Sequence, residues 1–349
     1  MRAPCVIAEP GSPMPQTDDR YARLDAARWL AAAAVVLLHS AALIVSEPAA
    51  YGNGAWLAAN LYDSAARWCV PVFVMVSGAL LLDPARPEDA RRFYSKRAAR
   101  ILTPLVFWSL FYLAWRTGLD WWDDGHVDFS FWPRKVAQGE PYYHLWYLYM
   151  IVGLYLFAPL VRLLYARSTP RSRSLWVMGI LGLAILDALY RRALGAQPGF
   201  FLTWFLPYLG YFVAGRQIFD GELRVPRPAL VLAASVGATA LGVYTLSSNR
   251  TLDTYFYDYF SLTVPFMSLA AFQCIVSSPR LPRLASLAPL TFGVYLIHPV
   301  FLDVAHRAGA ISGARRDAWV VPLLTLAVFA LSAASSWLLR RHPATRKLV

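Results

Sequence analysis

The first long apolar stretch of the chain carries an arginine and a histidine eleven positions apart, Arg28 and His39. Eleven residues of α-helix make about three turns plus roughly 20°, so the two side chains share one face, roughly 16 Å apart along the axis. An ionisable side chain at membrane depth costs about 2.5 to 3.5 kcal/mol and usually faces a protein interior or a water-filled cavity. The pair is therefore a candidate functional site. The alternative is an arginine that reaches the interface and a neutral histidine of the core.

A second basic group begins a later apolar stretch, in the sequence Arg91-Arg92-Phe-Tyr-Ser-Lys96-Arg97-Ala-Ala-Arg100. Arg97 and Arg100 are three residues apart and so lie on one face of a helix. Guanidinium groups bind phosphate oxygens in pairs, which suits a phosphorylated ligand. A basic cluster that touches anionic lipid head groups is the other explanation.

The chain as a whole is apolar and poor in charge, because 58% of its 349 residues are hydrophobic and only 15% are charged. Soluble domains contain about 25% charged residues. The composition therefore predicts an all-α polytopic membrane protein. Cys5, Cys69 and Cys274 have no paired spacing, which argues against a disulfide framework or a zinc site. The net charge of +12 does not indicate nucleic-acid binding here, since its distribution among loops matters more.

Ten apolar windows predict about ten transmembrane helices. They cover residues 24–45, 63–82, 98–117, 145–165, 175–189, 199–219, 228–246, 256–277, 287–306 and 318–339. The tails and alternate loops hold 22 basic residues and the other loops hold 9, so the positive-inside rule puts both termini in the cytoplasm. We expect residues 1–20 to be a disordered cytoplasmic tail, 21–341 the transmembrane domain and 342–349 a second cytoplasmic tail.

With this orientation, three histidines fall in the outer half of the membrane: His39, His144 and His298. Imidazole accepts a proton near neutral pH, so a histidine beside an acceptor hydroxyl is a natural general base. A thioester donor that enters from the cytosol needs its phosphates at the inner mouth and its acyl end roughly 15 to 20 Å deeper. The predicted axial separation of Arg28 and His39 is comparable.

The longest predicted outer loop, residues 118–143, is rich in carboxylates and aromatic rings. Aromatic rings commonly contact sugar faces and carboxylates accept hydrogen bonds from hydroxyls, so a sugar acceptor is one explanation. An aromatic belt at the membrane interface explains the tryptophans equally well. The residues concerned are Asp120, Trp121, Trp122, Asp123, Asp124, His126, Asp128, Trp132 and Glu140.

Other familiar signals are absent or misleading. The sequence contains no GxSxG, no HExxH and no phosphate-binding glycine loop. His298 and Asp303 have the spacing of the soluble glycerolipid acyltransferase box, but five helical steps put them about 140° apart, so we expect no pair. Asp187 lies within an apolar window, and we expect it to be buried with a partner that the sequence does not identify.

These residues resemble the integral-membrane acyltransferase 3 family, the bacterial O-acyltransferases that modify cell-surface polysaccharides. The segment Tyr143-His144-Leu-Trp146-Tyr-Leu-Tyr149 further resembles the subgroup that acetylates enterobacterial common antigen and related glycans. The resemblance covers about residues 21–341. It rests on Arg28-x10-His39, Phe73-Val-Met-Val-Ser77-Gly78, Arg97-x-x-Arg100 and Val294-Tyr-Leu-Ile-His298.

The resemblance implies a multi-pass protein of the bacterial inner membrane that takes acyl-CoA on the cytoplasmic side and acylates a sugar on the outer side. It implies that His39 is catalytic, that Arg28 supports the site or the donor, and that Arg97 and Arg100 contact the CoA phosphates. The residues predicted to bind the acceptor substrate are His144, Trp146 and His298. We expect acyl-CoA as donor substrate, a cell-envelope glycan or lipid-linked sugar as acceptor, membrane lipids as neighbours, and no permanently bound cofactor, metal or nucleic acid.

The main alternative is a transporter or flippase for a lipid-linked sugar, in which buried polar residues line a pathway and perform no chemistry. An inverted repeat in the hydropathy would favour it, and none is evident. A membrane scaffold or sensor is a third interpretation. It predicts that Arg28 and His39 can both be lost without any change in glycan composition.

Overall fold

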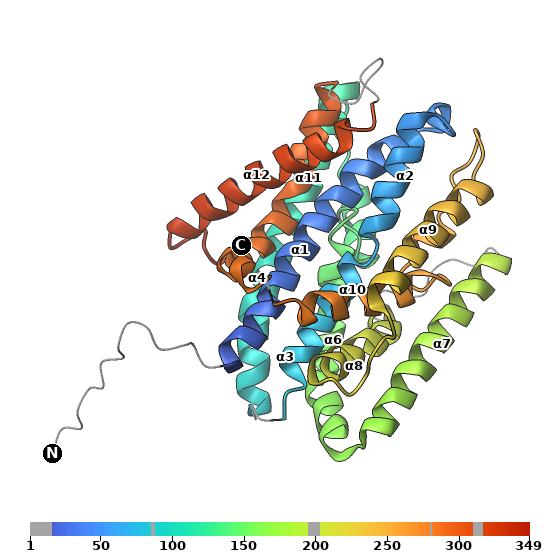
Figure 1. Cartoon of the computed structure of the whole chain (residues 1–349). Coiled ribbons are helices and arrows are strands. Elements are labelled where there is room, and N and C mark those ends of the chain that lie inside the picture. The colour runs from blue at the N-terminus through green and yellow to red at the C-terminus, as the bar shows by residue number, and fades with distance from the viewer. Residues whose placement is uncertain (1–15, 85–87, 195–202, 280, 310–316) are drawn as a thin grey trace.

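The computed structural model describes residues 16–84, 88–194, 203–279, 281–309 and 317–349, and every regular element in these ranges is a helix (Figure 1). Short 3₁₀ helices occur at η1 (Pro48–Ala50), η3 (Tyr255–Tyr257) and η4 (Leu281–Leu290). The α-helices are α1 (Gln16–Val45), α2 (Gly54–Ala66), α3 (Cys69–Leu81), α4 (Ala90–Asp124), α5 (Phe131–Ala137), α6 (Trp146–Arg167), α7 (Pro170–Leu194), α8 (Phe205–Asp220), α9 (Pro228–Leu246), α10 (Val264–Ser277), α11 (Thr291–Arg307) and α12 (Val320–Arg341).

The predicted class, an all-helical polytopic membrane protein, is confirmed. Eight helical segments in the described part of the chain are long and apolar enough to cross a membrane. Two further segments that the sequence predicted as spans correspond to α8 and α10, which are shorter, with 16 and 14 residues. Each of the ten predicted windows therefore contains a helix, and the membrane crossing by α8 and α10 stays a prediction.

Several predicted boundaries were wrong. Helix α1 already begins at Gln16, so the last five residues of the expected tail 1–20 are helical, while residues 1–15 lie outside the described part. Helix α4 continues to Asp124 and so includes the first seven residues of the predicted outer loop. Gly125 caps this end of the helix, because its φ of 67° is left-handed and its N–H donates to the carbonyl of Trp121.

The predicted window 63–82 also contains two helices and not one. Helix α2 begins nine residues earlier, at Gly54, and stops at Ala66, and α3 begins at Cys69. Pro71, in the first turn of α3, has no N–H to donate to a carbonyl of the preceding turn, which favours a break at this point. The break places Arg67 at the end of α2, inside the protein.

Helix α1 occupies the centre of the bundle, where it packs against α2, α3, α10, α11 and α12 (Figure 1). Small side chains let helix backbones approach closely in a membrane, where no hydrophobic effect drives helices together. The alanines of α1 serve this purpose, and this packing holds Arg28 and His39 within the protein. Those that are fully buried are Ala26, Ala27, Ala31, Ala32 and Ala41.

Helices α3 and α8 cross at backbone contact. A Cβ atom on Gly78 would lie 1.8 Å from the carbonyl oxygen of Phe212, and one on Gly215 would lie 2.1 Å from the carbonyl oxygen of Met75. Both positions therefore require glycine, because backbone atoms cannot move away as a flexible side chain can.

We expect Gly78→Ala and Gly215→Ala each to lower the free energy of unfolding by about 1 to 3 kcal/mol, because a methyl group forces the two helices apart. Thermal denaturation of the detergent-solubilised protein measures this. Gly237→Ala is the matched control, since a Cβ there, on α9, meets nothing within 4 Å. Equal melting temperatures for all three variants would contradict the close crossing.

Candidate active site between two pockets

Two histidines from opposite ends of the sequence meet at the centre of the site. The Nδ1 atom of His39, on α1, lies 2.8 Å from the Nε2 atom of His298, on α11. The ring planes differ by only 7° and the ring centroids are 5.0 Å apart, so the bonded nitrogens face each other and the rings lie edge to edge. This is the geometry of a hydrogen bond in the plane of both rings.

The protonation pattern of the pair follows from the far side of His298. Its Nδ1 atom lies 2.8 Å from the carbonyl oxygen of Tyr295. A carbonyl oxygen only accepts, so this nitrogen carries the hydrogen, and in the neutral ring Nε2 has the lone pair. His39 must then donate from Nδ1, which leaves the Nε2 lone pair of His39 as the free base of the pair.

Pro299 explains why the carbonyl of Tyr295 is available. In an α-helix this oxygen would accept from the N–H four residues later, but residue 299 is a proline and has none. The ring of His298 takes its place as the donor. The dipeptide His298-Pro299 therefore sets the tautomer of its own histidine and, through it, that of His39.

The two members of the pair differ in exposure. His298 is completely buried, whereas His39 is partly exposed and packs edge-on against the ring of Tyr143, with 5.0 Å between ring centroids. Within the described residues the Nε2 atom of His39 makes no hydrogen bond. The buried histidine can therefore act only through the exposed one.

His144 lies beside the pair in a shell of aromatic rings. Its ring centroid is 5.5 Å from that of His298 and 4.8 Å from that of Tyr112, and only 2% of the residue is exposed. Its carbonyl oxygen accepts a 2.6 Å hydrogen bond from the hydroxyl of Tyr295. Neither ring nitrogen of His144 makes a hydrogen bond of normal geometry among the described residues. The structure thus brings together all three histidines that the sequence singled out.

A pocket of about 1090 Å³ opens on one side of this cluster, and we call it the basic pocket. Nine of its lining side chains are basic and three, Asp25, Glu88 and Asp89, are acidic, so it carries an excess of positive charge. Arg28, Arg97 and Arg100, which the sequence analysis grouped together, all line it. The full basic set is Arg28, Arg92, Lys96, Arg97, Arg100, Arg162, Arg340, Arg346 and Lys347.

Three of these cations are partly neutralised. Arg28 pairs with Asp25 at 2.6 Å, and Glu88 accepts from Lys96 at 2.5 Å and lies 4.0 Å from Arg97. The hydrogen bond from Lys96 lowers the pKa of the Glu88 carboxyl, and the nearby arginines add to the effect. Glu88 therefore stays ionised and holds these two side chains at the rim.

The basic pocket becomes apolar and aromatic at its other end, where it is lined by Phe73, Tyr147 and Tyr295. Ser77 also lines it and lies 3.3 Å from the hydroxyl of Tyr155. Tyr295 precedes His298 by three residues on α11, so this end of the pocket comes within one helical turn of the histidine pair.

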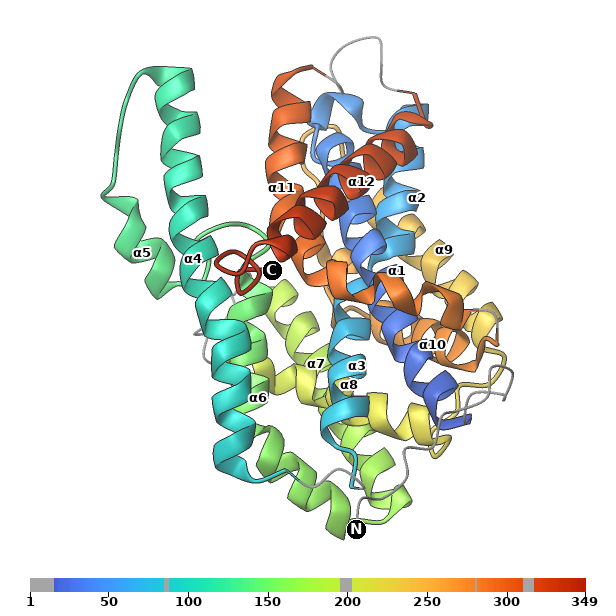
Figure 2. The ribbon, with the colours of Figure 1, turned by 90° about the vertical axis from the view of Figure 1, so that its left-hand side faces the viewer.

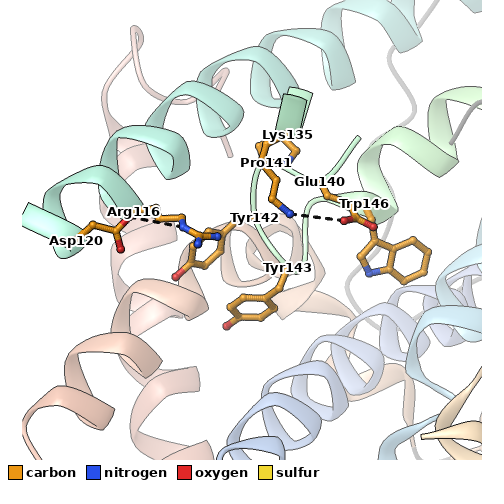
Figure 3. Close-up of a pocket in the computed structure, with 8 residues that line it drawn as sticks. All are labelled: Arg116, Asp120, Lys135, Glu140, Pro141, Tyr142, Tyr143 and Trp146. Atoms are coloured by element: carbon orange, nitrogen blue, oxygen red, sulfur yellow. Dashed lines mark ion pairs between the residues drawn. The ribbon is translucent and has the colours of Figure 1, made fainter. Parts of the chain in front are cut away.

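A second pocket, of about 550 Å³, lies by the segment between α5 and α6, and we call it the aromatic pocket (Figure 3). Trp146, Tyr142 and Tyr143 line it together with two ion pairs, Arg116–Asp120 at 3.8 Å and Lys135–Glu140 at 3.9 Å. Of the residues predicted to bind the acceptor, Trp146 lines this pocket, while His144 and His298 lie behind it and line neither pocket.

Asp303 anchors the wall of the aromatic pocket. Its Oδ2 atom accepts from the hydroxyl of Tyr142 at 2.6 Å and from Nε1 of Trp115 at 2.8 Å. These bonds tie α11 and α4 to the segment that carries Tyr143 and His144. Among the described contacts Asp303 makes none with His298, in agreement with the angle expected between them.

The histidine pair stands between the two pockets. His39 contacts Tyr143 of the aromatic pocket, and His298 lies next to Tyr295 of the basic pocket, with 6.4 Å between their ring centroids. The adjacent residues Trp146 and Tyr147, at the start of α6, line the aromatic and basic pockets respectively. Neither His39 nor His298 lines a pocket itself, but each lies next to a residue that does.

The sequence analysis missed one buried ion pair, and it expected burial of an aspartate that is exposed. Asp63 and Arg67, on the last turn of α2, form an ion pair in which the aspartate side chain is 1% exposed, and Arg67 also lies over the ring of Tyr257. Opposite charges four residues apart in an apolar window were the available signal. Asp187, expected to be buried, is instead 61% exposed and pairs with Arg191 at 2.9 Å.

Within the described ranges, no group of three or more His, Cys, Asp or Glu side chains is placed to hold a metal ion. The arrangement of the site itself offers a neutral imidazole base, a cationic pocket on one side and an aromatic, partly acidic pocket on the other. These features suit transfer of a group from an anionic donor to a polar acceptor.

Comparison with curated proteins and with solved structures finds no match. A family model described as an acyltransferase domain, that of the acyltransferase 3 family, matches residues 21–341. The match includes the histidine pair and helices α2 to α12 in full, and it ends with α12. The chain is therefore a membrane acyltransferase that belongs to the acyltransferase 3 family.

Proposed function

We propose that this protein transfers an acyl group, most simply acetyl, from acyl-CoA to a hydroxyl group of a cell-envelope polysaccharide or lipid-linked sugar. The observation that carries the proposal is the position of the His39–His298 pair between a basic pocket and an aromatic pocket. Membership of an acyltransferase family favours this chemistry over transport of a lipid-linked sugar.

The basic pocket suits coenzyme A as donor. Its cations match the diphosphate and the 3′-phosphate, because guanidinium groups bind phosphate oxygens in pairs. Its aromatic lining by Phe73, Tyr147 and Tyr295 suits the less polar pantetheine arm, which would bring the thioester toward the histidines. In the predicted orientation this pocket opens to the cytoplasm, where acyl-CoA is made.

The aromatic pocket suits a sugar acceptor, because its rings can contact the faces of the sugar while Asp120 and Glu140 accept hydrogen bonds from hydroxyls. In the predicted orientation it faces the outer side of a bacterial inner membrane. An acceptor hydroxyl that passes Tyr143 reaches the free Nε2 atom of His39.

The proposed reaction follows from the tautomer of the pair. Nε2 of His39 removes the proton of the acceptor hydroxyl, and the oxygen attacks the thioester carbonyl. The carbon–sulfur bond then breaks and the proton passes to the departing CoA sulfur. Nδ1 of His39 keeps its hydrogen bond to His298 throughout, so the imidazolium is stabilised as it forms. A route in which His39 first takes the acyl group covalently uses the same atoms.

We expect His39→Ala to lower acyl transfer by about 10²- to 10⁴-fold, the usual contribution of a general base. Mass spectrometry of surface glycan from cells with the wild-type protein, with the variant and with no protein gives the readout. The wild type should add the mass of one acyl group and the variant none. Immunoblotting of membranes must show equal amounts of both proteins. Normal acylation with His39→Ala would refute the assignment.

We expect His298→Ala to lower kcat by up to about 10²-fold with little change in the KM for acyl-CoA, because the loss of the acceptor leaves the tautomer of His39 undefined. His298→Gln keeps a carbonyl oxygen that can accept from His39 Nδ1 and should recover part of the rate. Steady-state kinetics of the purified protein measure this. Equal kcat values for both variants would show that His298 only fills space.

We expect Arg100→Gln to raise the KM for acyl-CoA roughly tenfold, since a charge-assisted hydrogen bond to phosphate contributes about 1.5 to 3 kcal/mol. The matched control on the same helix is Arg91→Gln, because Arg91 does not line the basic pocket. The KM for the acceptor should stay constant in both variants. A similar KM for acyl-CoA in Arg91→Gln and Arg100→Gln would exclude a direct contact.

A further inference from the structure

The segment after α12 returns to the protein and does not extend away from it. Residues 342–349 lie beside α4 and α11, as the ribbon at the C-terminal end shows (Figure 2). Trp108, on α4, donates a 2.8 Å hydrogen bond from Nε1 to the carbonyl of Leu348, and Val349 is 8% exposed. The expected cytoplasmic tail is thus packed against the core at its end.

Hydrogen bonds within the segment fix its path. The hydroxyl of Thr345 donates to the carbonyl of Leu339 at 2.6 Å, which closes the end of α12. The N–H of Arg346 donates to the carbonyl of His342 at 3.0 Å. The side chains that follow therefore have a defined position relative to α4.

This path adds cations to the basic pocket. Arg340, Arg346 and Lys347 all line it, together with the cations of α4. Arg346 and Lys347 form no ion pair with any carboxylate of the described residues, in contrast to Lys96, which Glu88 neutralises. Much of the uncompensated positive charge of the pocket therefore comes from this segment.

Cations on one helix face contact a bound phosphate from one side only. A donor that carries a diphosphate and a separate phosphate presents several anionic oxygens, and each guanidinium or ammonium group can satisfy only a few of them. Arg28 on α1 and Arg162 on α6 already add cations to those of α4, and the segment after α12 is a further element that brings cations to the same pocket.

We propose that residues 340–347 form a second cationic wall of the basic pocket, in which Arg346 and Lys347 bind phosphate groups of the acyl-CoA donor. The inference rests on the proposed function, because it takes acyl-CoA as the donor. The segment is a binding element that lies far from the cations of α4 in the sequence. The hydrogen bond from Trp108 to the carbonyl of Leu348 then helps to hold the donor site together.

The test compares the binding of coenzyme A by the purified full chain in phosphatidylcholine nanodiscs. We expect the double variant Arg346→Gln/Lys347→Gln to bind coenzyme A roughly 10- to 100-fold more weakly than the wild type. Pantetheine, which has no phosphate, should bind both proteins equally. The matched control is Arg341→Gln, because Arg341 lies over the ring of Trp337, at 3.6 Å, and does not line the pocket.

A charge-retaining variant, Arg346→Lys/Lys347→Arg, separates loss of charge from loss of fold, and it should bind coenzyme A within about threefold of the wild type. If it binds as weakly as the neutral variant, the proposal is overturned. An equal loss of pantetheine binding in the neutral variant also overturns it, because the segment would then only shape the pocket.

Anionic lipid is the other source of phosphate for these cations. If they hold lipid head groups, the neutral variant will keep its affinity for coenzyme A and lose only its preference for nanodiscs that contain phosphatidylglycerol, which overturns the proposal. If the wild-type protein transfers acyl groups and both double variants bind coenzyme A normally, the second cationic wall is overturned. The proposed function stands in that case. A wild-type protein that binds no coenzyme A overturns the proposed donor and this inference together.

Discussion

The hydrogen bond from His39 to His298 is the interaction on which the rest of the site depends. A lone imidazole in an apolar helix could present either nitrogen as a base, and its ring could turn. The bond removes both freedoms, because His298 is itself fixed by the Tyr295 carbonyl that Pro299 leaves without a helical partner. Two helices far apart in the sequence must therefore pack at one definite distance, which the alanines of α1 permit.

The same packing separates two kinds of surface. Cations gather in the basic pocket from α1, α4, α6, α12 and the segment after α12. The aromatic pocket is built from the end of α4, from α5, from the segment between α5 and α6, and from the start of α6. Helices α4 and α6 line both pockets, and α1 joins the two regions through Arg28, which lines the basic pocket, and His39, which packs against Tyr143 of the aromatic pocket. Under the proposed function, the donor and the acceptor therefore occupy different cavities on their way to His39.

Apolar windows and charge in the sequence predicted the fold class and most helices. They also predicted the residues that gather at the site, because burying an ionisable residue in an apolar helix costs free energy and therefore suggests a function. The contacts between them were not predictable. That His39 meets His298 depends on the tertiary packing of α1 against α11, and the fold of residues 342–349 onto Trp108 has no local signal. The extension of α4 to Asp124 was missed because polar residues continue a helix beyond an apolar window.

Under the proposed function, a thioester lies beside a base and needs protection from water, since hydroxide or an activated water would consume it. Aromatic rings lie at the boundary between the pockets. The ring of Tyr147 packs against Tyr295 with 5.7 Å between centroids, and Tyr143 packs edge-on against His39. Tyr143 also lines the aromatic pocket, so one ring belongs to this pocket and contacts His39. Under the proposed function, Tyr143 therefore links binding of the acceptor in the aromatic pocket to the surroundings of His39.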